Sequence, residues 1–164
     1  MPHETALDRI DFGILEALQN NARMSNKELA SAVHLAPSSC LERVRRLRKS
    51  GCLRGFHADV DPVALGIGLE ALVSVRIRNH SRPLLEKFQT HIMGLAETVN
   101  LFHLAGANDF MVHVVVRDAA HLRDLALDAF TARPEVEHIE TALIFDHQRS
   151  TSLPNYSVQE RSTR

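Results

Sequence analysis

The chain has 164 residues, a formal net charge of −1 at pH 7 and 45% hydrophobic residues. This length fits two small domains, each of which needs help from its neighbour to bury a core. The polar, acidic segment 1–11 argues against a secretory signal, and no apolar run approaches the ~20 residues of a membrane helix. We therefore expect a cytoplasmic protein.

The N-terminal segment predicts two helices. Helical spacing of apolar residues indicates a first helix over about 8–20, and these residues are Leu7, Ile10, Ile14 and Leu18. Ser25 and Glu28 have the spacing of a capping box, which satisfies the free amides at a helix start. A second helix is therefore predicted over about 26–33, with Leu29, Ala30 and Val33 facing inward.

A third helix is predicted to begin at Pro37, whose missing N–H is not needed in a first helical turn, and to end at Gly51. Its buried stripe is expected to be Leu41, Val44 and Leu47. Positive charge gathers here, because residues 41–54 hold only one acid and six cations: Arg43, Arg45, Arg46, Arg48, Lys49 and Arg54. Two short helices joined by a tight turn, the second of them basic, are typical of a DNA-binding helix-turn-helix.

We expect the third helix to enter the major groove of double-stranded DNA. Small residues in its first turn permit a close approach, Arg43 and Arg46 reach guanine edges or phosphates, and the neighbouring cations neutralise the backbone. The predicted DNA-binding residues are Ser38, Ser39, Cys40, Arg43, Arg45, Arg46 and Lys49. The alternative is a solvated basic helix on an ordinary domain.

Beyond residue 52 the pattern changes to that of strands. Residues 53–60 alternate well enough to predict one strand, which Asp61 and Pro62 end, and we place the hinge between two domains here. Further strands are predicted over 69–77, 99–105, 110–116 and 136–145. One helix runs from Pro83 to Gly94, and another ends before Pro134. The order strand, helix, strand, strand, helix, strand predicts a ferredoxin-like βαββαβ domain of the α+β class.

Such a domain carries helices on one face of its sheet only. The other face is predicted to present apolar residues that would form one patch in water, namely Leu72, Leu101, Met111, Val115 and Ile144. A symmetric homodimer with sheet facing sheet would cover this patch. A two-fold protein also suits paired DNA half-sites.

The predicted organisation has four parts. They are a helix-turn-helix domain (1–52), a hinge strand and linker (53–66), a ferredoxin-like effector-binding and dimerisation domain (67–147) and a polar tail (148–164). We expect the tail to be an arm or a disordered segment, because it is polar and interrupted by proline.

No group of residues predicts catalysis. Cys40 and Cys52 fit no paired metal-ligand motif and are expected to be separate free thiols. Alternation would place His103 and His113 on the same sheet face, where a metal or pH-sensing site is one alternative and packed interface histidines are the favoured one. We expect no catalytic residues, no metal and no cofactor.

Four segments resemble the Lrp/AsnC family of transcriptional regulators, also called feast/famine regulators. They are LDRIDFGILEALQNNARMSNKELA, APSSCLERVRRLRKSGCLRGF, DPVALGIGL and AGANDFMVHVVVRD, within a likeness over about 7–146. The resemblance implies a bacterial regulator with a winged or plain helix-turn-helix. It also implies dimers that often assemble into octamers, and a small effector, usually an amino acid, bound between C-terminal domains.

The resemblance also assigns an effector loop. Its acidic position, which would meet an ammonium group, is Asp109, for which plain turn chemistry is the alternative. The implied effector-binding residues are Gly106, Ala107, Asn108, Asp109, Phe110 and, from a neighbouring subunit, Thr141.

Three residues depart from the pattern of similar proteins. Ala107 stands where an acid is usual and Ile139 where a hydroxyl is usual. These two favour an apolar or aromatic amino acid, or a ligand outside the amino acids, over a cationic one. Ala36 stands where a serine commonly caps the third helix, and losing such a cap costs ~1 kcal/mol.

The sequence leaves two other functional classes to compare with a DNA-binding regulator. A small ferredoxin-like enzyme is disfavoured because no nucleophile-and-base pair is recognisable in the sequence. A ligand-responsive oligomeric interaction module that does not bind DNA is the stronger alternative. Salt-dependent binding to a palindromic promoter fragment, weakened by Arg43→Ala or Arg46→Ala, distinguishes the regulator from both.

Overall fold

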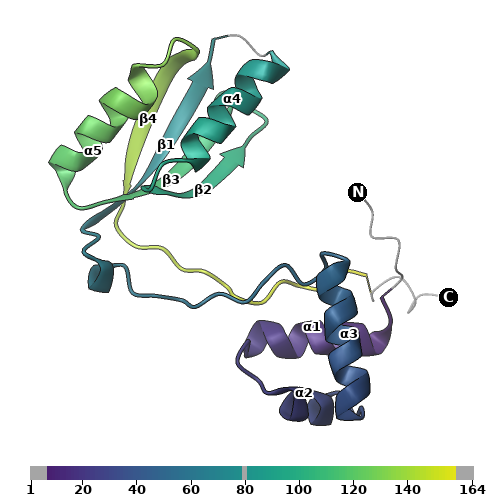
Figure 1. Cartoon of the computed structure of the whole chain (residues 1–164). Helices are drawn as coiled ribbons and strands as arrows, with labels where there is room; N and C mark the ends of the chain where they lie inside the picture. Colours follow the sequence, from purple (N-terminus) through teal and green to yellow (C-terminus); the bar gives the residue numbers. More distant parts are fainter. Residues whose placement is uncertain (1–6, 79–80, 158–164) are drawn as a thin grey trace. The chain divides into compact units, whose positions relative to one another are not determined.

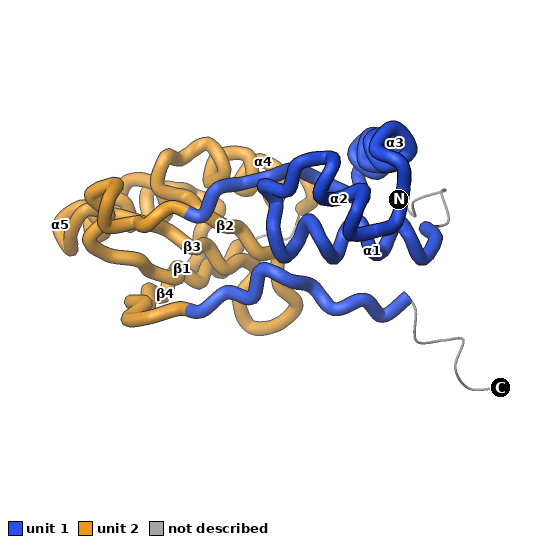
Figure 2. Tube along the Cα trace, turned by 90° about the horizontal axis from the view of Figure 1, so that it is seen from below, with its two compact units in different colours: residues 1–59, 148–164 blue, residues 60–147 orange. Residues whose placement is uncertain are grey.

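A computed structural model describes residues 7–78 and 81–157 of the chain. The chain divides into two compact units (Figure 2). Of the described residues, unit 1 contains 7–59 and 148–157, and unit 2 contains 60–78 and 81–147. The outermost parts of the predicted first domain and tail, 1–6 and 158–164, lie outside the described residues. Within the described ranges, no helix is both long enough and apolar enough to cross a membrane.

Unit 1 contains the three predicted helices (Figure 1). They are α1 (Arg9–Asn20), α2 (Asn26–Ala32) and α3 (Pro37–Lys49). The capping box predicted at Ser25 and Glu28 is confirmed, because the Ser25 hydroxyl accepts from the Glu28 N–H and the Glu28 carboxylate accepts from the Ser25 N–H. Gly51, with φ of 76°, follows α3 in the left-handed conformation that suits a helix end.

The core of unit 1 is small. Its buried residues are Ile14, Leu18, Leu29, Ala30, Cys40 and Leu47. The predicted stripe of α3 was wrong at one position, because Leu41 is 38% exposed while Cys40 is fully buried. Positions 40, 44 and 47 share one side of a helix of 3.6 residues per turn, and Leu41 lies about 100° away from Cys40.

The strand predicted over 53–60 is absent from the described structure. Their side chains alternate as in a strand, but no partner strand lies among residues 7–78 and 81–157, and a strand forms only where its backbone groups pair with another strand. The described part of unit 1 therefore carries helices only, without the strands of a wing. The tail stretch 148–157 belongs to unit 1, where the Leu153 N–H donates to Gln19 Oε1 over 2.7 Å.

Unit 2 is the predicted βαββαβ domain. Its elements are β1 (Leu69–Ile77), α4 (Arg82–Met93), β2 (Thr98–His103), β3 (Phe110–Val116), α5 (Ala119–Leu125) and β4 (Val136–Ile144). The strands are antiparallel in the order β2-β3-β1-β4, and α4 and α5 cover one face of the sheet (Figure 1). A short 3₁₀ turn, Val63–Leu65, precedes β1.

The helix α5 continues as a π-helical segment, Ala126–Thr131. The carbonyl of Ala129 cannot receive a π-helical hydrogen bond from five residues ahead, because Pro134 has no N–H. The His91 side chain of α4 takes that place, with Nε2 lying 3.0 Å from the Ala129 oxygen. One histidine thus joins the two helices that cover the sheet.

The two faces of the sheet differ as predicted, with one correction in β2. The buried side chains of β1 and β3 alternate toward the helices, and Leu72, Met111, Val115 and Ile144 are on the open face. Leu101 was predicted there but packs against the core, because it pairs with Val112 on the helix-covered face.

The same register separates two histidines that were predicted to share a face. His103 pairs with Phe110, and the two rings stack with centroids 4.7 Å apart on the helix side. His113 pairs with Asn100 and accordingly is on the open face. Paired residues share a face, and residue 113 lies three positions beyond Phe110 on β3, so His103 and His113 are on opposite faces.

Candidate nucleic-acid interface and ligand loop

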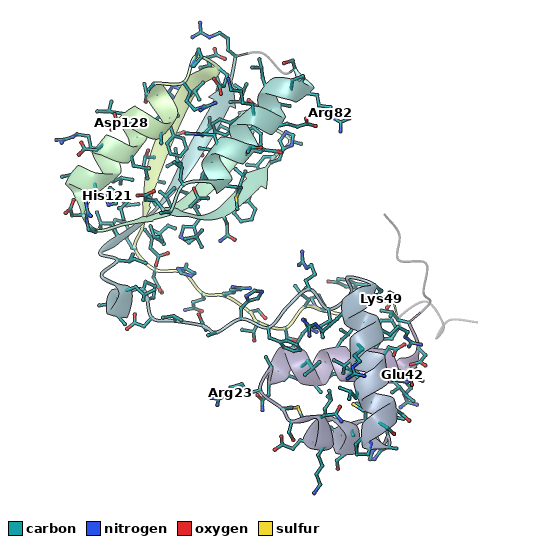
Figure 3. All side chains as sticks on the ribbon, in the orientation of Figure 1. Arg23, Glu42, Lys49, Arg82, His121 and Asp128 are labelled. Carbon is teal, nitrogen blue, oxygen red and sulfur yellow. The ribbon has the colours of Figure 1, made fainter. Side chains whose placement is uncertain are left out.

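The outer surface of α3 is polar and basic. It forms a shallow groove lined by Ser39, Glu42, Arg43, Arg45, Arg46 and Lys49. Ser38, Ser39, Arg45 and Lys49 are exposed there, as is Arg48 beside them. Figure 3 labels Glu42 and Lys49 on this helix. None of Arg45, Arg48 and Lys49 forms an ion pair with another described residue, so their charge is free to meet an anion.

Cys40 does not belong to this surface, which corrects its place among the predicted DNA-binding residues. Its side chain is fully buried in the core of unit 1. Burial raises the pKa of its thiol, because the charged thiolate is disfavoured away from water. Cys40 and Cys52 are both free cysteines.

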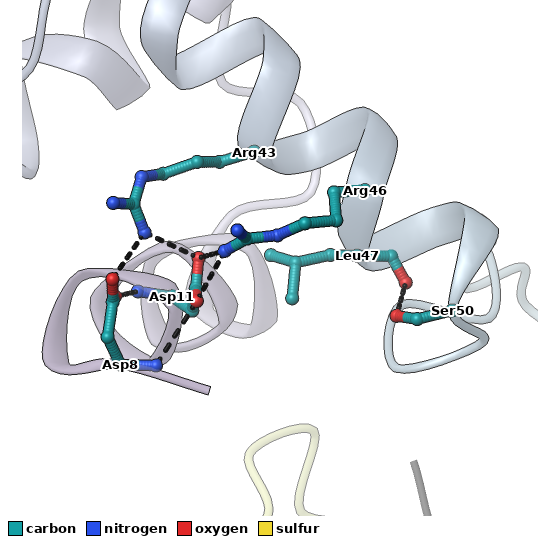
Figure 4. A network of polar contacts seen from close by, with 6 residues as sticks. All are labelled: Asp8, Asp11, Arg43, Arg46, Leu47 and Ser50. Atoms are coloured by element: carbon teal, nitrogen blue, oxygen red, sulfur yellow. Dashed lines mark hydrogen bonds and ion pairs between the residues drawn. The ribbon is translucent and has the colours of Figure 1, made fainter. Parts of the chain in front are cut away.

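Arg43 and Arg46 reach back to α1 and pair with two aspartates there (Figure 4). Arg43 Nη1 lies 2.7 Å from Asp8 Oδ2 and 2.9 Å from Asp11 Oδ1. Arg46 Nη2 lies 2.8 Å and 2.7 Å from the two carboxylate oxygens of Asp11. Asp11 is fully buried, so its charge is enclosed between the two arginines.

The same two aspartates cap α1. Asp8 Oδ1 accepts from the Asp11 N–H over 2.9 Å, and Asp11 Oδ2 accepts from the Asp8 N–H over 3.2 Å. The hydrogen bond from Arg43 is the main cause that holds the pKa of Asp8 below its usual value of 3.8, with the Asp11 N–H adding to it. Sequence reasoning missed this network, although an acid at 11 among the inward residues of the first helix was a signal for it.

The start of α3 has no side-chain cap, as the alanine at position 36 predicted. A tie to α2 lies beside it, where the Asn26 side-chain amide donates to the Pro37 carbonyl over 2.8 Å. The turn before α3 passes through His34, which has φ of 55° without being glycine. The helix that carries the basic surface is therefore positioned by α1 and α2 and not by its own N-terminal cap.

The predicted effector loop connects β2 to β3 and is tied to β1. Asp109 Oδ2 accepts from the Ile77 N–H over 2.7 Å, and the Asp109 N–H donates to the Val75 carbonyl over 2.9 Å. Arg76 Nε donates to the Ala107 carbonyl over 3.1 Å. Gly106 has φ of 147°, in the range that favours glycine, and open space surrounds it.

One of the predicted effector residues lies elsewhere than expected. Phe110 is fully buried, with its ring 5.0 Å from that of Phe88, so it belongs to the core and is corrected out of the ligand-contacting set. Thr141 is exposed on β4, where it pairs with Val73 of β1. Ile139 packs against the core of unit 2.

The open sheet face carries a polar cluster beside its apolar residues. His113 Nε2 lies 2.8 Å from Glu70 Oε2, and His147 Nδ1 lies 3.6 Å from the same oxygen. Throughout residues 7–78 and 81–157, no group of three or more His, Cys, Asp or Glu side chains is arranged to hold a metal ion.

Comparison with known proteins places both units in one family. Residues 7–48 match the AsnC-type helix-turn-helix domain, and residues 70–153 match the Lrp/AsnC ligand binding domain. The chain is 42% identical over 146 residues to the HTH-type transcriptional regulator AldR of Mycolicibacterium smegmatis, covering 89% of this chain and 85% of the relative. It is 32% identical over 146 residues to the leucine-responsive regulatory protein of Escherichia coli, covering 89% of each.

A solved structure shows the same architecture. It is that of a transcriptional regulator from Neisseria meningitidis in complex with L-Met. The two chains superpose with a TM-score of 0.83 at 30% sequence identity, and the match covers 91% of this chain and 97% of that one.

Proposed function

Because the chain belongs to the Lrp/AsnC family, with a DNA-binding helix-turn-helix domain and a ligand-binding domain, we propose that it is a sequence-specific transcriptional regulator controlled by an amino-acid-like effector. The observation that carries the DNA half of this proposal is the basic outer surface of α3. Three of its cations, Arg45, Arg48 and Lys49, have no ion-pair partner among the described residues. Small side chains in the first turn of α3 permit a close approach to DNA, and cations without an ion-pair partner can then bind the phosphate backbone.

In this proposal the first turn of α3 approaches the major groove and the remainder of its outer surface follows the backbone. Ser38 and Ser39 are exposed in that first turn and offer hydroxyls to bases or phosphates. The proposed DNA-contacting residues are Ser38, Ser39, Arg43, Arg45, Arg46, Arg48 and Lys49.

Salt-dependent DNA binding tests the proposal. A duplex selected by the protein from a random-sequence pool is titrated by fluorescence anisotropy at several KCl concentrations. Losing Arg45 and Lys49 in a double alanine variant removes two phosphate contacts, and each contact contributes about 0.9 to the slope of log K against log salt. The control is Arg82→Ala, which removes an exposed cation of α4 in unit 2. Binding that ignores both salt and the double variant would support a ligand-responsive interaction module instead.

For the ligand half, we propose that the loop 106–109 forms part of an effector site completed by Thr141 of a second subunit. Its support is the set of ties that fix this loop to β1, and the L-Met complex of the Neisseria regulator. Ala107 stands at a loop position where the family resemblance implies an acid, which favours an apolar or aromatic amino acid over a cationic one. A thermal-shift screen against the amino acids identifies the effector, because a ligand that binds the folded state raises its stability.

The screen needs a variant that keeps the loop intact. Asp109→Ala would remove the acceptor of the Ile77 N–H as well as the charge, so its loss of ligand response would be ambiguous. Asp109→Asn keeps an oxygen acceptor and removes only the charge. We expect it to abolish the thermal shift caused by the effector, whereas Glu137→Gln, an exposed acid of β4, leaves the shift intact. An undiminished shift in Asp109→Asn rejects the site.

We further propose that the protein is a homodimer that assembles to an octamer. The open face of the sheet supports the first step, because Leu72, Met111, Val115 and Ile144 share it. Light scattering coupled to size-exclusion chromatography measures the assembled mass. A mass of one chain would reject both steps, and a mass of two chains would reject the octamer alone.

A further inference from the structure

Two of the α3 arginines that contact DNA in the proposed function form ion pairs with acids of α1. Arg43 and Arg46 lie one turn apart on α3, and both donate to the single carboxylate of Asp11 on α1. Asp8 adds a second acceptor for Arg43. Figure 4 shows both guanidinium groups converging on this pair of aspartates.

The network is electrically balanced, because two guanidinium groups meet two carboxylates. The buried acid makes the pairing strong, since Asp11 is fully buried and has little contact with water that would screen it. The arginine side chains remain partly accessible, with 25% of Arg43 and 46% of Arg46 exposed. They differ in this respect from Arg45, Arg48 and Lys49, whose charge is not paired within the described residues.

A guanidinium has five N–H donors. The aspartates engage Nη1 of Arg43 and Nη2 of Arg46, so other donors of each group remain for a base edge or a phosphate. Holding a long side chain in place before binding removes part of the ordering cost of recognition. A paired cation also attracts a polyanion at long range less strongly than a free one.

Resting on the proposed DNA-binding function, we propose that Asp11, assisted by Asp8, is a positioning residue for DNA specificity. It holds Arg43 and Arg46 in one orientation and cancels their general attraction for DNA, so that these two arginines discriminate between sequences while Arg45, Arg48 and Lys49 provide the non-specific affinity. The acids act through the arginines and do not contact DNA themselves.

If the aspartates only stabilise the packing of α1 against α3, a different result is expected. Breaking the ion pairs would lower the stability of unit 1 and weaken binding to every duplex together. The positioning role instead predicts that binding to unrelated DNA rises while discrimination falls, because the freed arginines are both mobile and uncompensated.

The test compares Asp11→Asn, which keeps the shape and removes the charge, with the wild-type full-length protein. The matched control is Glu16→Gln, an exposed acid on the same helix. Each protein is titrated against a duplex selected by the wild type and against a shuffled duplex of the same composition, over a range of KCl concentrations.

For Asp11→Asn we expect shuffled-duplex affinity to rise on the order of threefold, with a salt slope steeper by about 0.9 for each DNA-bound subunit, because one more cation per subunit displaces counterions. The ratio of selected to shuffled affinity should fall by about tenfold or more, which corresponds to losing a single good base contact. Glu16→Gln should leave the ratio unchanged.

Three outcomes overturn the inference. They are an unchanged ratio in Asp11→Asn, equal weakening on both duplexes, and the same loss of ratio in Glu16→Gln. If Asp11→Asn fails to fold by circular dichroism, Asp8→Asn replaces it, because it removes the second acceptor of Arg43 and leaves both arginines in place. We expect Asp8→Asn to lower the ratio, and an unchanged ratio would again overturn the inference. A wild type that selects no duplex would overturn the proposed function instead.

Discussion

The interior of unit 1 and the interior of unit 2 are stabilised by different kinds of contact. Among the described residues, the core of unit 2 has fourteen buried residues, all of them apolar, between the sheet and its two helices. The described core of unit 1 has six, and a charged residue, Asp11, is buried beside it. Unit 2 also buries an acid, Glu135, but its partner Arg133 is two residues away in the chain. The partners of Asp11 are 32 and 35 residues away.

The two units therefore depend on different interactions to hold their elements in place. A large apolar core fixes the sheet and helices of unit 2 by close packing. The core of unit 1 is smaller, and the charge network between α1 and α3 adds a long-range constraint on the position of α3. We therefore expect unit 2 to respond mainly to cavities, and unit 1 to pH and to changes in its turns.

The largest effect is expected from a cavity in unit 2. Phe88→Ala removes a fully buried ring of α4 and should lower the free energy of unfolding of unit 2 by about 3–5 kcal/mol. Hydrogen exchange measured by mass spectrometry separates the two units, and protection in α1 to α3 should be unchanged. Leu127→Ala, at a residue that is 53% exposed, is the control and should change little. Equal losses from both substitutions would contradict the packing argument.

A smaller effect is expected at the link between α4 and α5. His91→Leu removes the hydrogen bond to the Ala129 carbonyl, and an unsatisfied buried group costs about 1–3 kcal/mol. Urea denaturation measures the loss. His91→Gln retains an N–H donor and should recover part of it. If the two variants are equally destabilised, the contribution of His91 is packing and not hydrogen bonding.

In unit 1, a substitution in the turn between α2 and α3 should stabilise the folded state. His34 has φ of 55°, where a side chain is strained and glycine is not. His34→Gly should raise the free energy of unfolding of unit 1 by about 0.5–1 kcal/mol, because relief of strain exceeds the added freedom of the unfolded chain. His34→Val is the opposite control, since a β-branched residue fits this conformation worst. A loss of stability in His34→Gly would show that the histidine side chain makes a stabilising contact.

The smallest effect should appear as a pH dependence. Arg43 lowers the pKa of Asp8 in the folded protein. The ionised carboxylate therefore stabilises unit 1 fully when the pH is above the ordinary pKa of 3.8. This contribution is lost as the pH falls through the lower pKa of the folded state. Asp8→Asn should lower the Tm of unit 1 at pH 7, and the difference from wild type should shrink toward pH 3. Asp118→Asn, whose aspartate caps α5 in unit 2, should leave unit 1 unaffected throughout. A pH-independent difference for Asp8→Asn would exclude the ion pair as its cause.

Local patterns predicted most of the fold and part of the candidate site. Helical spacing, one capping box, the flanking proline and glycine of the third helix and strand alternation identified the three helices of unit 1 and the βαββαβ order of unit 2, and the family prediction is confirmed. The strand at 53–60 failed because a strand needs a partner, which alternation alone does not supply. Leu101 and His103 were assigned to the wrong face because the parity of β2 depends on its register with β3.

The charge network was out of reach for a different reason. Arg43 and Arg46 were expected to reach guanine edges or phosphates, and their pairing with Asp8 and Asp11 depends on how α1 crosses α3. No spacing rule within one helix contains that information, since the contact joins residues more than 30 positions apart. The burial of Cys40 in place of Leu41 is a smaller case of the same kind, because a rotation of one position decides it.

The return of the tail to unit 1 gives the chain the architecture of a domain insertion. Unit 2 is continuous in the gene, from residue 60 to residue 147, while unit 1 is encoded on both sides of it. A fragment that ends at residue 59 would lack the hydrogen bond from Leu153 to Gln19. The tail stretch 148–157 is therefore part of unit 1, although unit 2 separates it from the helices in the sequence.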